Sequence, residues 1–293
     1  MSRYCGKRVL APMFSAAEQW RQLGLVEDKS VFAEDPLWQL DHFEALDRYF
    51  VTQLDSGEGN FFEKLEAQLE QAVPGVKQLA AEMLWVMLLC PSNISAAKKR
   101  EGISEIWNWS GLPFPGQSRL LEDETLLGAG SAGVSYNVNR RLELAYFIRV
   151  MLAFKQLASA ERERLLSDGW EMAKWLEQIP ENESRQFRNM FLYLLFPDDF
   201  ERIFGGTDRR EVVKAFTGRT MQQVKKLKAI EIDRIFLETR NKYAREFDDD
   251  DIDDHRLCRI ATPGGRNDCG CRPRGSRSPH TGSCGCAGLH DSR

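Results

Sequence analysis

Apolar residues recur at intervals of three and four along this chain, from residue 15 to about residue 245. The stripes cover residues 37–54, 61–69, 76–87, 142–157, 160–176, 182–195 and 221–247. This spacing is typical of helices that turn one face toward a core. Asp35 followed by Pro36 predicts the start of the first helix. Strand signals are few, so the pattern predicts an all-α, multi-helix globular domain.

The middle of this helical region, residues 107–133, is rich in glycine and proline and shows no sustained period. We expect a long irregular connection here, and connections of this length are usually functional or mobile. The first domain therefore covers residues 1–247, and if it contains two subdomains they divide near residues 108–135.

The chain changes character after Phe247. An acidic run, Asp248 to Asp254, leads into a segment without lysine or aromatic residues. Such a segment buries too little apolar surface to fold, so residues 248–293 are predicted to form an acidic linker and a disordered tail. Seven Arg and two Asp from His255 onward give about +5, which leaves about −9 for the remainder. That remainder is too acidic overall to suggest general nucleic-acid binding.

Targeting signals and membrane spans are not evident in the sequence. Residues 80–90 are the most hydrophobic stretch, but Glu82 interrupts it and Pro91 ends it, so it predicts a buried helix. Cys5 and Cys90 are far apart, which does not favour a disulfide framework. We expect a cytoplasmic protein without a membrane partner.

Gly128, Gly130 and Gly133 match the dinucleotide pattern G-x-G-x-x-G. That chemistry needs a buried strand before the loop and a helix at the third glycine, so that backbone N–H groups meet the pyrophosphate. Residues 120–127 do not have the pattern of a parallel strand. A flexible loop is the preferred interpretation, and nucleotide binding is kept as an alternative.

Two C-x-C pairs lie in the tail: Cys269 with Cys271, and Cys284 with Cys286. Four thiolates can bind Zn²⁺, but a one-residue spacing is unusual and no apolar residues surround the pairs. Incidental cysteines are the preferred interpretation.

Short basic clusters are candidate contacts to DNA or to an acidic partner. They comprise Lys98, Lys99 and Arg100, then Arg140 and Arg141, then Arg209, Arg210 and Lys214, and finally Lys225, Lys226 and Lys228. Trp107 and Trp109 lie beside the first cluster and are candidates for stacking on a base. The alternative interpretation is that the clusters are solvated helix ends and the tryptophans belong to a core or lid.

Several motifs occur in a particular order: QLAAEMLWVMLLCPSNISAAKKREGI (78–103), SYNVNRRLELAYFIRVMLAFKQL (135–157), LLSDGWEMAKWLEQIP (165–180), RNMFLYLLFPDDFERIF (188–204) and RREVVKAF (209–216). This succession resembles the N-terminal region of bacterial AAA+ NTPases related to McrB, over about residues 15–250. The resemblance implies a helical recognition or regulatory region followed by a motor that uses ATP or GTP with Mg²⁺, with a partner nuclease that cuts DNA.

The motor's phosphate-binding and arginine-finger residues have no matching positions in this chain, so we expect no cofactor for it alone. Its Arg/Gly/Cys-rich end is what a high-GC gene yields when read out of frame, and we hypothesise a truncated or frameshifted product. The leading prediction is a non-catalytic region that acts on DNA, on an AAA+ motor or on a nuclease subunit. The alternatives are a stand-alone helical interaction module and a nucleotide-binding protein, and the oligomeric state is left open.

Overall fold

The protein is built from helices, as the sequence predicts. A computed structural model describes residues 9–54 and 59–246, and among these residues there is no β-strand, apart from an isolated bridge between Pro91 and Gly130. The acidic run and the tail lie outside the described residues. The α-helices are α1 (Ala11–Trp20), α2 (Leu40–Leu46), α3 (Phe61–Gln68), α4 (Pro74–Leu89), α5 (Ala96–Asn108), α6 (Asp123–Leu126), α7 (Gly133–Val138), α8 (Arg140–Lys155), α9 (Ser159–Ser167), α10 (Gly169–Leu176), α11 (Phe187–Leu195), α12 (Gly206–Thr217), α13 (Met221–Val224) and α14 (Ala229–Glu246). Short π- and 3-10 segments complete the set: η1 (Arg21–Val26), η2 (Asp47–Val51), η3 (Arg119–Leu121) and η4 (Asn182–Ser184).

Helix α4 lies at the centre of the main body, which comprises residues 9–54 and 59–204. Pro74 stands at its first turn, where a missing N–H costs nothing, and 13 of its 16 residues are buried. Helices α1, α2, α5 and α8 pack around it. Each large apolar side chain buried in this way stabilises the fold by about 1.5–3 kcal/mol relative to exposure.

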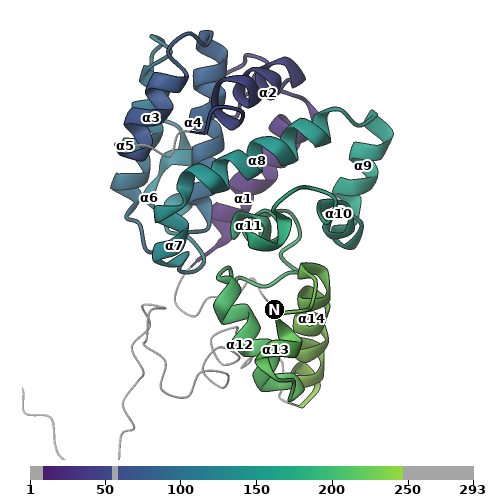
Figure 1. Cartoon of the computed structure of the whole chain (residues 1–293). Helices are drawn as coiled ribbons and strands as arrows, with labels where there is room; N and C mark the ends of the chain where they lie inside the picture. Colours follow the sequence, from purple (N-terminus) through teal and green to yellow (C-terminus); the bar gives the residue numbers. More distant parts are fainter. Residues whose placement is uncertain (1–8, 55–58, 247–293) are drawn as a thin grey trace, which may run out of the picture.

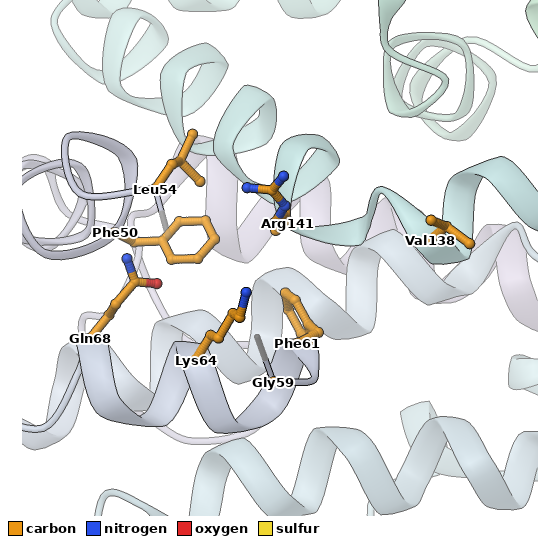
Figure 2. Close-up of a pocket in the computed structure, with 8 residues that line it drawn as sticks. All are labelled: Phe50, Leu54, Gly59, Phe61, Lys64, Gln68, Val138 and Arg141. Carbon is orange, nitrogen blue, oxygen red and sulfur yellow. The ribbon is translucent and has the colours of Figure 1, made fainter. Parts of the chain in front are cut away.

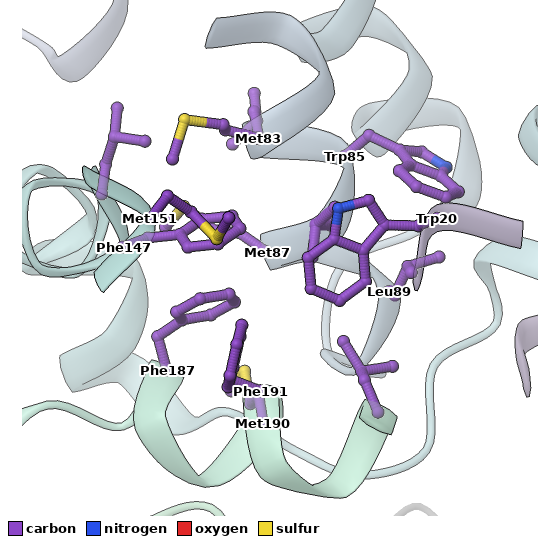
Figure 3. Packing of buried hydrophobic residues seen from close by; sticks show 14 of the residues in the cluster. Trp20, Met83, Trp85, Met87, Leu89, Phe147, Met151, Phe187, Met190 and Phe191 are labelled. Atoms are coloured by element: carbon purple, nitrogen blue, oxygen red, sulfur yellow. The ribbon is translucent and has the colours of Figure 1, made fainter. Parts of the chain in front are cut away.

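A cluster of aromatic rings joins the N-terminal helix to later parts of the chain (Figure 3). The Trp20 ring centroid lies 5.7 Å from that of Trp38 and 5.9 Å from that of Phe191. Phe147 on α8 and Phe187 on α11 approach to 4.3 Å. Tilted and edge-on pairs of this kind add roughly 0.5–1.5 kcal/mol each beyond their buried area. The core therefore includes residues on both sides of the glycine- and proline-rich connection.

Several predicted helices are interrupted in the structure. The helix that was predicted to start after Pro36 begins at Leu40 as α2, because residues 30–38 form a loop around the buried carboxylate of Glu82. The predicted helix 160–176 divides at Asp168, whose side chain accepts hydrogen bonds from the N–H groups of Trp170 and Glu171 and so begins α10. The predicted helix 221–247 divides between α13 and α14.

The irregular connection is shorter than predicted. Helix α5 continues to Asn108, and η3 and α6 lie within the segment that was expected to lack structure. Two hydrogen bonds hold η3 to the body: Trp85 Nε1 donates to the Leu120 carbonyl at 3.0 Å, and Arg100 Nη1 donates to the Leu121 carbonyl at 3.0 Å. Residues 108–135 therefore pack against the core and do not separate two cores.

A smaller second core lies at the C-terminal end of the described chain, in α12, α13 and α14, which we call the C-terminal unit (Figure 1). It consists of Val212, Val213, Val224, Ile232 and Phe236, together with Ile203 from the segment that precedes α12. Thr220 begins α13 through a capping box with Gln223, and Gly218, with φ of 68°, ends α12 in the left-handed region. The change of core thus falls near residue 203.

Buried ion pairs connect this unit to the main body. Asp233 on α14 pairs with Arg188 on α11 and with Arg209 on α12. Arg240 on α14 donates to Glu201 at 2.5 Å. Removing one partner from such a buried pair costs about 3–5 kcal/mol, because the other charge is left uncompensated. The Arg188–Asp233 and Arg240–Glu201 pairs hold the unit against the main body, whereas the Arg209–Asp233 pair lies within the unit.

Glu82 on α4 is fully buried and holds the loop of residues 30–38 against the main body through hydrogen bonds. Its carboxylate accepts hydrogen bonds from the Ser30 hydroxyl, the Val31 N–H and the Trp38 indole N–H, the last at 2.6 Å. Burial is the largest influence on its acidity and raises the pKa of Glu82 to about 7, although the hydrogen bonds from Ser30 and Trp38 act in the opposite direction.

This raised pKa predicts a pH-dependent stability. Between the unfolded value of 4.5 and about 7, the folded chain holds a proton at Glu82 that the unfolded chain has lost. The contribution is therefore complete below pH 4.5 and is lost as the pH rises through 7. Urea unfolding should show the stability of the wild type, relative to Glu82→Gln, falling by about 3 kcal/mol from about pH 4 to about pH 8. The same comparison with the exposed Glu124→Gln provides the control, and a flat Glu82→Gln difference curve would contradict the assignment.

Candidate nucleic-acid interface

The first basic cluster divides into exposed and structural residues. Lys98 is exposed. Lys99 is fully buried, and its ammonium donates to the Leu126 carbonyl at 2.6 Å. Arg100 pairs with Asp123 at 2.5 Å. The sequence analysis grouped all three side chains as one candidate surface. In the structure the ammonium group of Lys99 is buried, and the Leu126 carbonyl accepts its hydrogen bond there.

The two tryptophans beside this cluster also differ. Trp107 is 2% exposed, and its indole N–H donates to the Pro113 carbonyl at 3.0 Å. Its ring packs edge-on against Phe32 and Phe114. Trp107 is therefore a core residue in this structure, as the alternative interpretation holds. Trp109 is half-buried and packs against the same core.

Arg140 and Arg141 begin α8 and lie on the main body. The Arg140 guanidinium lies 5.5 Å from the centroid of the Phe61 ring, and burial lowers its pKa from the ordinary value. Arg141 lines a cavity of about 120 Å³. Figure 2 shows Arg141 on one side of this cavity, with Lys64 and Gln68 of α3 on the other. No residue of the other basic clusters lines this cavity.

The third and fourth clusters meet in the C-terminal unit. Arg209 is buried between the Asp233 carboxylate and the Phe236 ring, 4.8 Å from the ring centroid, and burial lowers its pKa. Arg210 is half-buried, and Lys214 is exposed. Arg209, Arg210 and Lys225 line one cavity, although 15 residues separate the last two in sequence. The fold thus brings one residue of the fourth cluster beside two residues of the third.

Two further arginines line the same cavity and were not predicted from the sequence. Arg185 precedes α11, and Arg188 lies in its first turn with 1% exposure. The available signal was an arginine in the first turn of an otherwise apolar helix, a position where an unpaired charge is costly. The missing information was its partner, Asp233, which lies 45 residues further along.

The charge of the described chain is segregated between its two cores. Residues 205–243 contain ten basic and five acidic side chains, a net +5. The main body carries 19 basic and 28 acidic side chains, a net −9. The net negative charge of the described chain as a whole therefore conceals a basic unit of about 40 residues.

The glycine loop has a structural role. Its Ala129 and Gly130 N–H groups donate to the Cys90 carbonyl at 2.9 and 3.2 Å, and the Ala132 N–H donates to Asn93 Oδ1 at 3.2 Å. Helix α6 precedes the loop where a dinucleotide site needs a strand, and α7 after it has six residues. N–H groups that a pyrophosphate would need are already engaged by protein acceptors, so this loop does not present a dinucleotide cradle.

The candidate zinc ligands, Cys269, Cys271, Cys284 and Cys286, lie outside the described residues. Within the described part of the chain, no group of three or more His, Cys, Asp or Glu side chains could hold a metal ion. Nor is any helix in that part long and apolar enough to cross a bilayer. Cys90 is buried, and burial raises the pKa of its thiol.

Comparison with known proteins finds no matching family model, no significantly similar curated protein and no significantly similar solved structure.

The docking of the glycine loop predicts a large cost for Gly128→Ala. Gly128 has φ of 76°, and an added Cβ would lie 2.4 Å from the Pro91 carbonyl oxygen. Gly111 also has a positive φ, 75°, but nothing lies within 4 Å of an added Cβ. Gly111→Ala should therefore cost only the left-handed backbone penalty, about 1–2 kcal/mol, and Gly128→Ala clearly more. Equal losses of unfolding free energy in urea titrations would show that the loop is not docked on Pro91.

Proposed function

We propose that this chain is a non-catalytic recognition and regulatory region that binds DNA, of the kind that precedes the motor in AAA+ NTPases related to McrB. The observation that carries the proposal is the net +5 of residues 205–243 beside a main body of net −9. A basic unit attracts the phosphate backbone, while the acidic body repels it and so orients the chain on the duplex.

The proposed contact surface consists of six basic side chains that reach solvent on α12, α13 and the segments that follow them: Arg210, Lys214, Arg219, Lys225, Lys226 and Lys228. Contacts of this type give affinity without reading sequence. Choice of a modified base would need further contacts. The order of the sequence motifs supports a role in DNA restriction or phage defence, in which ATP or GTP with Mg²⁺ belongs to the motor of a full-length relative.

The proposal predicts salt-dependent DNA binding. Fluorescence anisotropy with a labelled duplex, plain or cytosine-methylated, should show an affinity that falls steeply across a salt series. Lys226→Ala combined with Lys228→Ala should make the log–log salt slope shallower by about 2, because each lysine neutralises about one phosphate.

Lys98→Ala is the matched control, since Lys98 is exposed on the acidic body. Its slope should equal that of the wild type. No binding to either duplex, or a shallower slope in Lys98→Ala alone, would overturn the proposed surface.

A second candidate function is a stand-alone helical interaction module, which one observation favours. Val134 and Val138 lie one turn apart on α7 and are 78% and 72% exposed. If this face binds a partner or a second copy of the chain, Val134→Ser with Val138→Ser should reduce association in sedimentation velocity. If the wild type sediments only as a monomer at high concentration, self-association through this face is excluded.

A further inference from the structure

A small cavity of about 70 Å³ lies at the junction between the main body and the C-terminal unit. Its basic side chains come from three separate parts of the chain. The lining contains five basic residues and one carboxylate, namely Arg185, Arg188, Arg209, Arg210, Lys225 and Glu183. A cavity with this excess of positive charge favours an anion.

Arg188 provides the second observation. It is 1% exposed, and its Nη1 donates to Asn189 Oδ1 at 3.2 Å and pairs with Asp233. Its Nε and Nη2 are buried without a hydrogen-bond acceptor. A carboxylate oxygen of Glu177 lies 4.0 Å from Nη2, which is too far for a hydrogen bond. Buried guanidinium donors without acceptors are costly, and a bound oxyanion would satisfy them.

The neighbouring carboxylates balance much of this charge but leave two donors of Arg188 without an acceptor. The two oxygens of Asp233 are divided between Arg188 and Arg209, and the Glu177 carboxylate lies 4.0 Å from Arg188. Arg185 pairs with Glu181 at 3.2 Å and lies 4.0 Å from Glu143. Arg210 and Lys225 stand at the more exposed side of the cavity. An anion entering there would meet these two cations first and the buried arginines beyond them.

We propose that this cavity binds a single phosphoryl group. Its volume suits one compact tetrahedral oxyanion and is far below the roughly 300 Å³ or more of sites that enclose a drug-sized ligand. Guanidinium groups form paired hydrogen bonds with phosphate oxygens, and a lysine adds a point charge. The group is either a free small phosphate or the terminal phosphate of a nucleic acid. The proposal does not depend on the DNA contacts of Lys226 and Lys228.

The test is isothermal titration calorimetry of the full-length chain with inorganic phosphate, carried out on the wild type and on two double variants. Arg210→Ala with Lys225→Ala removes the two cations at the more exposed side of the cavity and should weaken phosphate binding about tenfold or more. Lys98→Ala with Lys174→Ala removes the same charge from exposed positions outside both the lining and the proposed DNA-contact surface. It should change binding by less than about twofold at about 0.15 M salt, where exposed charges are screened.

Two oligonucleotides distinguish the sources. A 5′-phosphorylated strand that binds more tightly than its 5′-hydroxyl counterpart, with the difference abolished in Arg210→Ala/Lys225→Ala, identifies a nucleic-acid end. Equal binding of the two strands alongside phosphate binding identifies a free phosphate. No phosphate binding by the wild type, or equal losses in the two double variants, would overturn the site. DNA binding to a 5′-hydroxyl duplex would then still stand as a separate result.

Discussion

Burial of α4 on all sides is the constraint on which the rest of the structure depends. A helix with 13 of 16 residues buried is stable only when other elements cover its whole circumference, so α1, α2, α5 and α8 must surround it. Its one buried carboxylate, Glu82, must then find donors, and the loop of residues 30–38 supplies them. Its C-terminal end at Cys90 leaves a carbonyl that the glycine loop satisfies. The glycine loop, which matches a nucleotide-binding pattern in the sequence, thus helps to complete this core.

The functional consequence is a separation of roles within the chain. In the main body several charged groups are structural: Lys99 binds a carbonyl oxygen, and Lys155 contacts the Gly24 carbonyl at 2.7 Å as well as Asp28. The C-terminal unit instead has six basic side chains that reach solvent within residues 210–228, a stretch with one acidic residue. The buried Asp233 fixes this unit to α11, so its basic face and the junction cavity have a defined position relative to the body. A polyanion contacting the unit would therefore touch the same surface on which the phosphoryl cavity opens.

The helical class could be predicted from the sequence because three- and four-residue periodicity depends only on local spacing. The breaks were harder to predict. Asp168 and Gly169 carry a readable cap signal. Gly169 also has no room for a Cβ, because an added Cβ would lie 2.8 Å from Phe196 Cγ, which only the fold reveals. The candidate site was predicted only in part, because whether a basic residue is exposed depends on distant acceptors. Lys99 and Arg209 look like Lys98 and Arg210 in sequence, and their partners lie 27 and 24 residues away. Net charge averaged over the chain likewise hid the basic unit.

Hydrogen exchange measured with and without a DNA duplex shows whether the C-terminal unit contacts DNA, because it locates the contact surface without altering any charge. Backbone amides in α12 and α13 and in the turn that follows, within residues 206–230, should gain protection, with no change in α5 or α8. Protection confined to residues 96–108 or 140–155, or no protection anywhere at saturating DNA, would contradict the assignment of the C-terminal unit as the binding surface.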